Sequence, residues 1–310
     1  MPDSIETQYE DGLPGYVEDV RERIEYLESQ PKGYFAEPNI KGSGKGKRAL
    51  LWQYLLALDS TAFTEKQTTG DCVSHGSRNA RDVTRACAIM VRRQPFDFYK
   101  RGATEPTYGA RGHSGQGMSP ARASRFERDT GFLSREDHGV VDLSVYKSSI
   151  GTGWGRSGVP KDVQELCNNN KVNNIQLVKT QDDLMDAMVN GYAAHSGQYA
   201  AWASSPSKRN VHERKSGGWA HDMAIVGYDD TLEFWPFRVW FIANSWGKWN
   251  RPVTDWPSSY PKAPGGLIVT SADDFDVCVR SSDCWVYGGI DGYPPQRLPD
   301  LGTIGMLKND

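Results

Sequence analysis

Three short segments of the sequence carry residue types that could act together as a nucleophile, a base and an orienting group. They read QTTGDC, WAHD and NSWG, and they contain Cys72, His221 and Asn244 in that order. A thiol is a strong nucleophile only as a thiolate, which the N-terminus of a helix and a nearby imidazolium both stabilise. An Asn side chain can hold a His in one orientation and tautomer. These residue types point to covalent catalysis through a cysteine.

The same segments offer donors for the oxyanion that acyl transfer creates. The backbone N–H of Cys72 and the side-chain amide of Gln67 could serve, and such a donor is worth about 3 kcal/mol. His75 is a rival base, because on a helix it would face the same side as Cys72. The sequence gives it no orienting partner, whereas His221 follows two glycines and enters a strand-like run, so we prefer His221.

The elements that must position these residues differ between the two halves of the chain. From Asp71 onward, apolar and small residues recur every three to four positions, which predicts a long helix that begins near Cys72. A second helix is predicted at 181–190. Runs rich in β-branched and aromatic residues predict strands at 192–196, 223–228, 238–243, 267–270 and 285–287. The first half is therefore expected to be mainly helical and the second mainly antiparallel β, which is an α+β fold.

Taken together, the segments resemble the papain family of cysteine peptidases. The order Gln, Cys, His, Asn is the family's order, HDMAIVGYDD resembles its His motif, and IANSWGKW resembles its Asn-Ser-Trp-Gly motif. The run GQGMSPARASRFERDTGFL resembles its glycine loop and the helix that follows. The resemblance covers roughly residues 60–290. It implies a papain-like two-lobed fold, with a helical left lobe that carries a long central helix and an antiparallel β-barrel-like right lobe.

The resemblance also implies roles for individual residues. The implied catalytic residues are Cys72, His221, Asn244 and Gln67. The implied substrate-binding residues are Gly115, Gly117, Trp219, Ala220, Asp222 and Trp246. Trp246 would shield the hydrogen bond between His and Asn from water, although a plain core Trp remains an alternative.

One of these residues suggests a specificity. The family usually has a small residue where this chain has Asp222, beside the catalytic His. We therefore hypothesise that Asp222 favours a basic or polar residue at the substrate position second from the scissile bond. Pro120 is expected on the other wall of that site.

The chain departs from the family pattern near the nucleophile. Four residues separate Gln67 from Cys72, one fewer than usual, so Gln67 is expected to reach the oxyanion differently. Val73 replaces the Trp that usually follows the nucleophile, and Thr69 replaces a disulfide Cys. These departures leave two questions open, which are how the oxyanion site is completed and whether the chain turns over substrate.

The domain organisation can be outlined from composition. Residues 1–55 are expected to form an N-terminal extension, with one charged helix at 16–30 and a basic Gly/Lys linker, KGSGKGKR, at 41–48. The linker lacks the spacing of a phosphate-binding loop, although an anion-binding role is an alternative. Residues 56–292 are expected to form the papain-like domain, mainly helical over 56–160 and mainly β over 161–292. Residues 293–310 form a tail. We expect the extension to cover the active site or to attach the protein to a partner.

Bulk properties exclude several classes of partner. The net charge of −3 and the pI near 6.1 do not favour nucleic acid or an anionic membrane. We find neither an apolar run of about 18 residues nor a secretory signal, so we expect a cytoplasmic or virion-associated protein. The five cysteines predict free thiols, with a pairing of Cys278 and Cys284 left open. No cofactor or metal is expected.

Three functions fit the sequence. The first is a thiol endopeptidase that cleaves a peptide or protein substrate. The second is a papain-like scaffold that serves as a structural or binding component of a phage virion or another large assembly, through its N- and C-terminal extensions. The third is another Cys/His enzyme, such as a peptidoglycan amidase or a transglutaminase-like protein. The NSWG segment argues against the third, because those classes usually orient their His differently.

Overall fold

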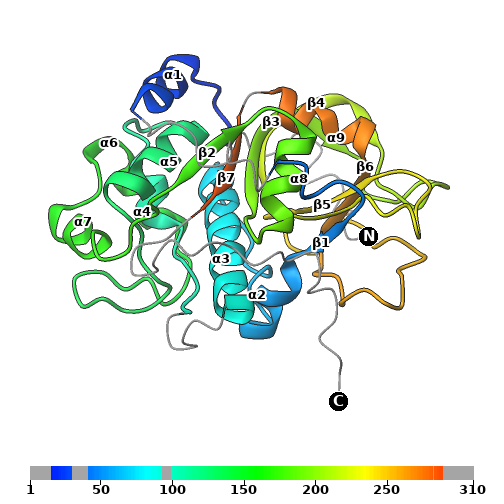
Figure 1. Cartoon of the computed structure of the whole chain (residues 1–310). Helices are drawn as coiled ribbons and strands as arrows, with labels where there is room; N and C mark the ends of the chain where they lie inside the picture. Colours follow the sequence, from blue (N-terminus) through cyan, green and yellow to red (C-terminus); the bar gives the residue numbers. More distant parts are fainter. Residues whose placement is uncertain (1–14, 30–40, 93–98, 282, 289–310) are drawn as a thin grey trace, which may run out of the picture.

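The computed structural model describes residues 15–29, 41–92, 99–281 and 283–288. Figure 1 shows a cluster of helices on one side and a sheet on the other, with the long helix α3 (Cys72–Arg92) between them. The helical side contains α4 (Glu105–Gly109), α5 (Pro120–Asp129), α6 (Ser148–Ser157) and α7 (Lys161–Cys167). This arrangement is the α+β, two-lobed one that the sequence predicted.

The strands of the described chain form one antiparallel sheet. Its order is β2-β7-β3-β4-β5-β6, and β1 pairs with β4 as a branch. The bounds are β1 (Arg48–Leu50), β2 (Ile175–Val178), β3 (Ala194–Trp202), β4 (Arg214–Asp229), β5 (Val239–Ala243), β6 (Leu267–Ser271) and β7 (Cys284–Tyr287). Among the described strands β4 is the longest, and it pairs with β1, β3 and β5. Successive side chains along it point to opposite faces of the sheet.

Helix α3 packs directly against the sheet because small residues line its contact face. Ala80, Val83 and Ala86 are fully buried, and α3 contacts both β3 and β4. Gly76 brings the helix so close to β4 that a Cβ there would overlap the carboxylate of Asp222. The helix therefore carries its first residue, Cys72, to the junction of the two lobes.

Aromatic side chains fill the β lobe. Trp240 on β5 stacks on Phe275 of α9 (Ala272–Arg280), with ring centroids 4.3 Å apart and planes inclined by 12°. The helix α8 (Gln181–Val189) begins at Thr180, whose side chain caps it, and Ser271 caps α9 in the same way. Burial of these large rings is the main stabilising term on this side.

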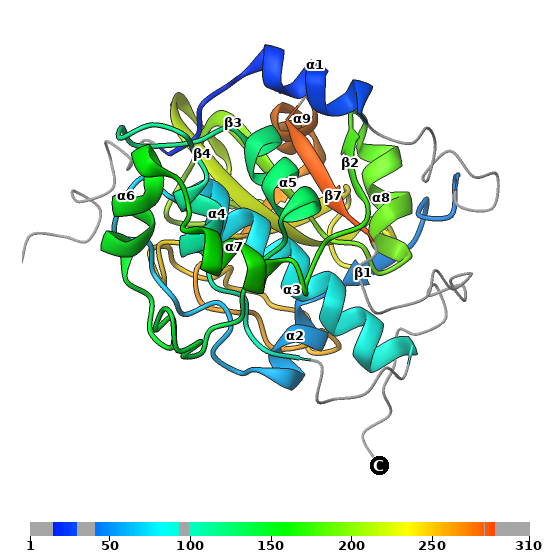
Figure 2. The same cartoon turned by 90° about the vertical axis from the view of Figure 1, so that its left-hand side faces the viewer.

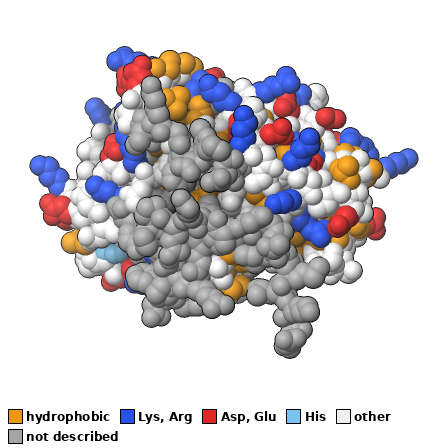
Figure 3. Space-filling model, in the orientation of Figure 1, with side chains coloured by type: hydrophobic (Ala, Val, Ile, Leu, Met, Phe, Trp, Pro, Cys, Tyr) orange, Lys and Arg blue, Asp and Glu red, His pale blue; other side chains and the backbone are white. Residues whose placement is uncertain are grey.

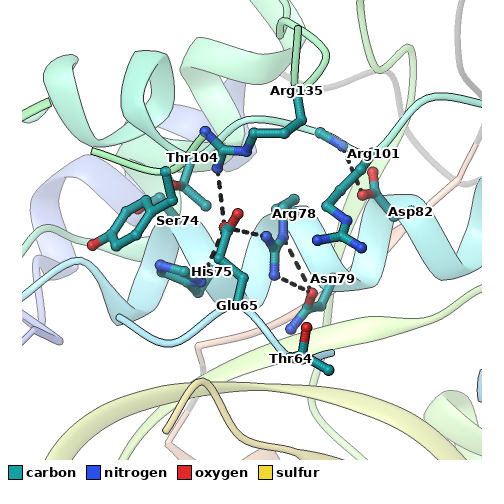
Figure 4. Close-up of polar contacts among 12 residues, drawn as sticks. Thr64, Glu65, Ser74, His75, Arg78, Asn79, Asp82, Arg101, Thr104 and Arg135 are labelled. Carbon is teal, nitrogen blue, oxygen red and sulfur yellow. Dashed lines mark hydrogen bonds and ion pairs between the residues drawn. The ribbon is translucent and has the colours of Figure 1, made fainter. Parts of the chain in front are cut away.

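Buried ion pairs hold the helical lobe. Arg81 on α3 lies 2.9 Å from Glu127 on α5, and both side chains are fully buried. Figure 4 shows a second group, in which Glu65 lies between Arg78 and Arg135. Each arginine has a carboxylate partner, which a buried charge requires.

The N-terminal helix α1 (Val20–Glu28) lies across the top of the molecule and contacts α5 (Figure 2). It is shorter than the predicted 16–30 helix. The buried residues are Glu22 and Tyr26, whereas Val20, Ile24 and Leu27 are exposed. Figure 3 shows hydrophobic side chains at this place on the surface. Polar contacts dock the helix: Ser119 donates to Glu22, and Arg122 pairs with Glu22.

The basic segment 41–48 is built into the β lobe. The backbone N–H groups of Gly42 and Gly44 donate to the carboxylate of Asp186 on α8, and that of Gly46 donates to Asp230. The anions that this loop binds are therefore carboxylates of the chain itself. Next to it, β1 enters the sheet and α2 (Trp52–Leu58) packs on α3.

Candidate active site

Cys72 is the first residue of α3, where the helix dipole favours an anion. Its side chain is fully buried, and Gly15 lies so close that a Cβ there would overlap the sulfur. This burial raises the pKa of the Cys72 thiol well above its ordinary value, and the charge of Asp222 raises it further. The backbone N–H groups of Asp222 and Val73 act in the opposite direction. In this state the sulfur is a neutral thiol at neutral pH.

His221 and Asn244 come from neighbouring strands of the sheet. His221 lies on β4, and Asn244 follows the last residue of β5. The two are joined by a hydrogen bond of 2.9 Å between Nε2 of His221 and Oδ1 of Asn244. Since an amide oxygen only accepts, His221 carries its proton on Nε2. Its Nδ1 has no hydrogen-bond partner among the described residues and can accept a proton.

Three tryptophans surround this histidine. The Trp246 ring stacks on His221 at 4.4 Å and 26°, and Trp219 and Trp249 pack edge-on against Trp246. Burial in this cluster lowers the pKa of His221 to about 4, and His75 lowers it too, while the bond to Asn244 raises it. The imidazole is therefore neutral at neutral pH, and its hydrogen bond to Asn244 is shielded from water.

The chain matches no family model and no curated protein. Among solved structures it is similar to xylellain, a cysteine protease from Xylella fastidiosa, at 14% identity and a TM-score of 0.52, over 89% of this chain and 96% of that one. It is also similar to the cysteine protease and lectin-like domains of Cwp84, a surface layer associated protein of Clostridium difficile. There the identity is 16% and the TM-score 0.51, over 91% of this chain and 61% of that one.

The fold is that of the papain-like cysteine proteases. At these identities the likeness concerns the fold, so the roles of individual residues have to be argued from their geometry. In the papain-like frame, the nucleophile candidate comes from the helical lobe and the base candidate from the β lobe.

Gln67 lies in the shortened loop before α3. Its backbone N–H donates to the carbonyl of Ser245 at 2.9 Å, and its side-chain oxygen accepts from the Ser245 hydroxyl. Its Nε2 donates to the carbonyl of Thr69 at 2.9 Å. Because the amide carries two hydrogens, a second donor remains for an oxyanion. This loop, which is one residue shorter than usual, is thus hydrogen-bonded to the segment that follows Asn244.

The two predicted glycines of the glycine loop lie in different places. Gly115 is exposed, and its carbonyl accepts from the Arg111 side chain at 2.9 Å. Gly117 is buried with a φ of 82°, and its N–H donates to the carbonyl of Gly70. A Cβ on Gly117 would meet the backbone of Gly15. The fold therefore brings Gly117, but not the exposed Gly115, against the backbone of Gly15 and Gly70 near Cys72.

The surroundings of Asp222 do not suit our expectation that it favours a basic or polar residue in the substrate. It is fully buried, and its carboxylate is bound by His195. Side chains alternate along a strand, so Asp222 points away from the face that His221 occupies. Of its neighbours, Trp219 belongs to the tryptophan cluster, and the Ala220 carbonyl accepts two backbone N–H groups.

Those two N–H groups belong to residues 15–17, which we call the strap. Gly15 and Tyr16 both donate to Ala220, at 3.1 and 3.0 Å. On the other side, Met118 donates to Gly15 and accepts from Val17, both at 3.0 Å. A Cβ on Gly15 would overlap the Cys72 sulfur, so the strap covers the nucleophile candidate. Of the two roles expected for the N-terminal extension, covering the active site or attaching to a partner, the position of the strap fits the first.

The Tyr16 side chain anchors the strap. Its hydroxyl donates to Asp283 at 2.8 Å, and its ring fills the space beside Gly197 that a Cβ there would need. Pro120, which we expected near the substrate, also lies beside Gly197. Sequence reasoning missed Met118, which binds the strap through its backbone and is buried in one cluster with Tyr16 and Cys72. It also missed Asp283, which precedes β7 and has no motif around it.

The rival base, His75, lies one turn along α3 on the helical side. Its ring is fully buried, with Nε2 at 3.5 Å from Asp71 and Nδ1 at 4.0 Å from Glu65. Figure 4 shows it beside Glu65 in the arginine group. It has carboxylate partners but no amide partner like that of His221. Over the described residues, no cluster of His, Cys, Asp and Glu is arranged to hold a metal ion, and no helix is both long and apolar enough to cross a membrane.

The five cysteines are free thiols. Cys278 and Cys284, whose pairing the sequence left open, are both buried and unbonded to each other.

Proposed function

We propose that the chain is a thiol endopeptidase held in a latent state by its own strap. The observation that carries this proposal is the His221–Asn244 hydrogen bond under Trp246, in a chain whose long helix α3 begins with a cysteine. The papain-like fold supports it. The bond fixes the tautomer that leaves Nδ1 of His221 unprotonated, as a base that activates a thiol must be.

The proposed reaction uses groups already described. Nδ1 of His221 takes the proton from Cys72, and the thiolate attacks the carbonyl carbon of the peptide bond. The oxyanion accepts from the backbone N–H of Cys72 and from Nε2 of Gln67. The imidazolium then gives its proton to the leaving amine, and water hydrolyses the acyl-enzyme. Asn244 holds the imidazole of His221 in one orientation throughout the reaction.

The closed state does not support turnover. Burial raises the pKa of Cys72 and lowers that of His221 to about 4, so both groups are neutral near pH 7. Each shift reflects lost solvation, which disfavours the thiolate and the imidazolium alike. Displacement of the strap would expose Cys72 and favour the ion pair. The strap thus acts both as a steric block and as a block to ionisation.

A labelling experiment tests the function. The full chain, a Cys72→Ala variant and a Tyr16→Ala variant are treated with an epoxide thiol inhibitor and with a fluorogenic peptide library. Tyr16→Ala removes the ring and the bond to Asp283 that anchor the strap. We expect labelling and hydrolysis to rise in Tyr16→Ala and to vanish with Cys72→Ala. Val20→Ala, on the exposed side of α1, is the matched control and should behave like wild type.

The same strap also favours the second candidate function, a papain-like scaffold that binds within a larger assembly. If the strap never leaves Cys72, the papain-like fold serves only as a binding module. A folded Tyr16→Ala protein that neither takes the label at Cys72 nor cleaves any peptide would refute the peptidase and favour the scaffold.

A further inference from the structure

Positive charge is concentrated in two segments beside the tryptophan cluster. Residues 203–215 run from the end of β3 into the start of β4, and residues 247–256 follow the Asn-Ser-Trp segment. Together they contain two acidic residues, Glu213 and Asp255, and six basic ones. The basic residues are Lys208, Arg209, Arg214, Lys215, Lys248 and Arg251. The whole chain, by contrast, has a net charge of −3.

These basic side chains have no carboxylate partners. All six are exposed, and none forms an ion pair with another described residue. Elsewhere on the surface, basic residues are paired: Arg21 lies 2.9 Å from Glu25, and Lys147 lies 3.0 Å from Asp142. A group of cations without nearby anions gives the surface a positive potential, which attracts anionic groups of a ligand.

Backbone and side-chain hydrogen bonds hold the two segments side by side. The N–H of Arg251 donates to the carbonyl of Ser204 at 2.7 Å. The Asn210 side chain donates to the carbonyl of Asp255 and accepts from the N–H of Thr254, both at 2.9 Å. The two segments therefore form one surface, and we call residues 203–215 and 247–256 the basic rim.

The basic rim borders the candidate active site. Trp249 lies between Lys248 and Arg251 in the sequence, and its ring centroid is 5.6 Å from that of Trp246. Trp246 in turn stacks on His221 at 4.4 Å. The rim is thus two ring contacts away from the proposed base.

The strap leaves this surface uncovered. Its hydrogen bonds go to Met118, Ala220 and Asp283, and the Tyr16 ring lies 5.1 Å from that of Tyr199. None of these contact residues belongs to the basic rim. A peptide that replaced the strap at the nucleophile could therefore continue past Trp246 onto exposed cations.

We propose that the basic rim binds acidic side chains of the substrate, on the side of the scissile bond that leads over Trp246 and away from the strap. The inference rests on the proposed function in taking His221 as the base, and it names the substrate class, a protein segment rich in Asp and Glu. An extended peptide advances about 3.4 Å per residue, so a carboxylate roughly three residues from the bond lies level with Trp249. The position beside a peptidase-like site favours a peptide over nucleic acid.

A binding assay without hydrolysis is the first test. The full-length Cys72→Ala chain is titrated with a short fluorescent peptide rich in Glu and with its twin, which has Gln at each Glu position. We expect the Glu peptide to bind about tenfold more tightly at low salt. Its advantage should shrink as salt is added, because salt screens exposed charges. Equal affinities at low salt would overturn the proposal.

A charge-neutral pair of substitutions locates the binding. Lys248→Gln with Arg251→Gln removes the two cations that flank Trp249 and should weaken binding of the Glu peptide by roughly tenfold, without affecting the Gln peptide. Lys161→Gln with Lys179→Gln removes two exposed lysines outside the rim and is the matched control, with the same net charge. Equal losses in the two double variants would overturn the proposal.

Other variants keep the test decisive. If the Lys248→Gln and Arg251→Gln chain does not fold, Lys208→Gln with Lys215→Gln takes its place, with the same expected loss. A single-stranded DNA oligonucleotide that binds more tightly than the Glu peptide, and loses affinity in the rim variant, would overturn the assignment to a peptide.

The chain's own N-terminal segment is a second possible occupant. Residues 1–14, which lie outside the described residues, contain Asp3, Glu6, Glu10 and Asp11 and no basic residue. The titrations are therefore repeated with these four residues changed to the corresponding amides, so that the segment cannot compete. A Glu peptide that binds no better than its Gln twin in this background as well would overturn the proposal.

Cleavage provides the closing experiment. In Tyr16→Ala, peptides with Glu placed at successive positions around the cleaved bond should show a kcat/KM raised by roughly tenfold on one side of that bond only. This advantage should disappear when Lys248→Gln and Arg251→Gln are added. Cleavage without any preference for Glu refutes the rim alone. A Glu peptide that binds through Lys248 and Arg251 but is never cleaved refutes the proposed function and leaves the rim as a peptide-binding surface.

Discussion

The two lobes of the molecule are stabilised by different interactions. The helical lobe buries ion pairs such as Arg81–Glu127 and Arg135–Glu105, at 2.9 and 2.7 Å. The β lobe buries aromatic rings, with Trp240 on Phe275 as the closest stacked pair. Removing one partner of a buried ion pair lowers stability because the other charge stays buried without compensation, whereas a ring stabilises the fold through its buried area.

The active-site candidates divide along the same line. Cys72 begins the helix that carries the arginines, and His221 sits among the tryptophans. The dry aromatic surroundings lower the pKa of His221 to about 4, and burial, followed by the charge of Asp222, raises that of Cys72. The charges that act on the two groups cross between the lobes, because Asp222 on β4 acts on Cys72 and His75 on α3 acts on His221. The comparison of the lobes teaches that burial at their junction, and not the composition of either lobe, keeps both groups neutral.

The largest effect is expected from a cavity in the β lobe. Trp240→Ala should lower the free energy of unfolding by about 4 kcal/mol, because it removes a fully buried ring and leaves a void. Urea denaturation measures it. Trp240→Phe, which keeps most of the area, is the matched variant and should cost clearly less. Equal losses for the two variants would contradict the idea that buried area holds this lobe.

Breaking one ion pair tests the helical lobe. Glu127→Gln leaves the fully buried Arg81 with Asp82, at 3.4 Å, as its remaining carboxylate, and should cost about 3 kcal/mol. The double variant Arg81→Met with Glu127→Gln should recover part of that loss, since the under-compensated positive charge is then gone. Strict additivity of the two single changes in urea denaturation would contradict the pairwise account.

The pH dependence of stability separates the lobes further. The pKa of His221 is lowered from 6.5 to about 4 on folding, so the unfolded chain binds its proton more readily. The stabilisation is complete above pH 6.5 and is lost as the pH falls towards 4. Its magnitude is about 3 kcal/mol. Denaturation curves of wild type and His221→Phe should converge as the pH falls. His138→Phe, a partly buried loop histidine, is the control, and a wild-type curve that stays parallel to His221→Phe would contradict the shift.

The sequence predicted much of this frame. The long helix, predicted from Asp71, is α3 (Cys72–Arg92), and the predicted strand 267–270 is β6 (Leu267–Ser271). Periodicity and motif order suffice there, because burial dictates the pattern. The first half of β4 escaped prediction, since Arg214–Gly218 is polar and Gly-containing and only pairing with β3 makes it a strand.

The misplaced residues have a physical cause as well. Asp222 was assigned to the substrate side through its neighbour His221, although alternation along a strand puts the two side chains on opposite faces. Its partner His195 lies on another strand, and no local pattern links them. The strap could not be predicted for a different reason: its backbone bonds use groups that any sequence offers, and the Tyr16 side chain meets Asp283 and Gly197, which lie far away in the sequence. Side-chain chemistry was thus predictable where it repeats locally, and not where it depends on register between strands.

The strap joins both lobes, and its anchor gives the smallest expected effect. Its backbone bonds go to Met118 on the helical side and to Ala220 on the β side, and the Tyr16 hydroxyl adds a bond to Asp283. Tyr16→Phe keeps the ring and removes this bond, which is worth about 1 kcal/mol. We expect labelling of Cys72 by a thiol reagent to quicken by roughly fivefold. Tyr199→Phe changes the neighbouring exposed ring and should have no effect. A rate unaltered in Tyr16→Phe but raised in Tyr16→Ala would show that packing of the ring, and not the hydroxyl bond to Asp283, closes the strap.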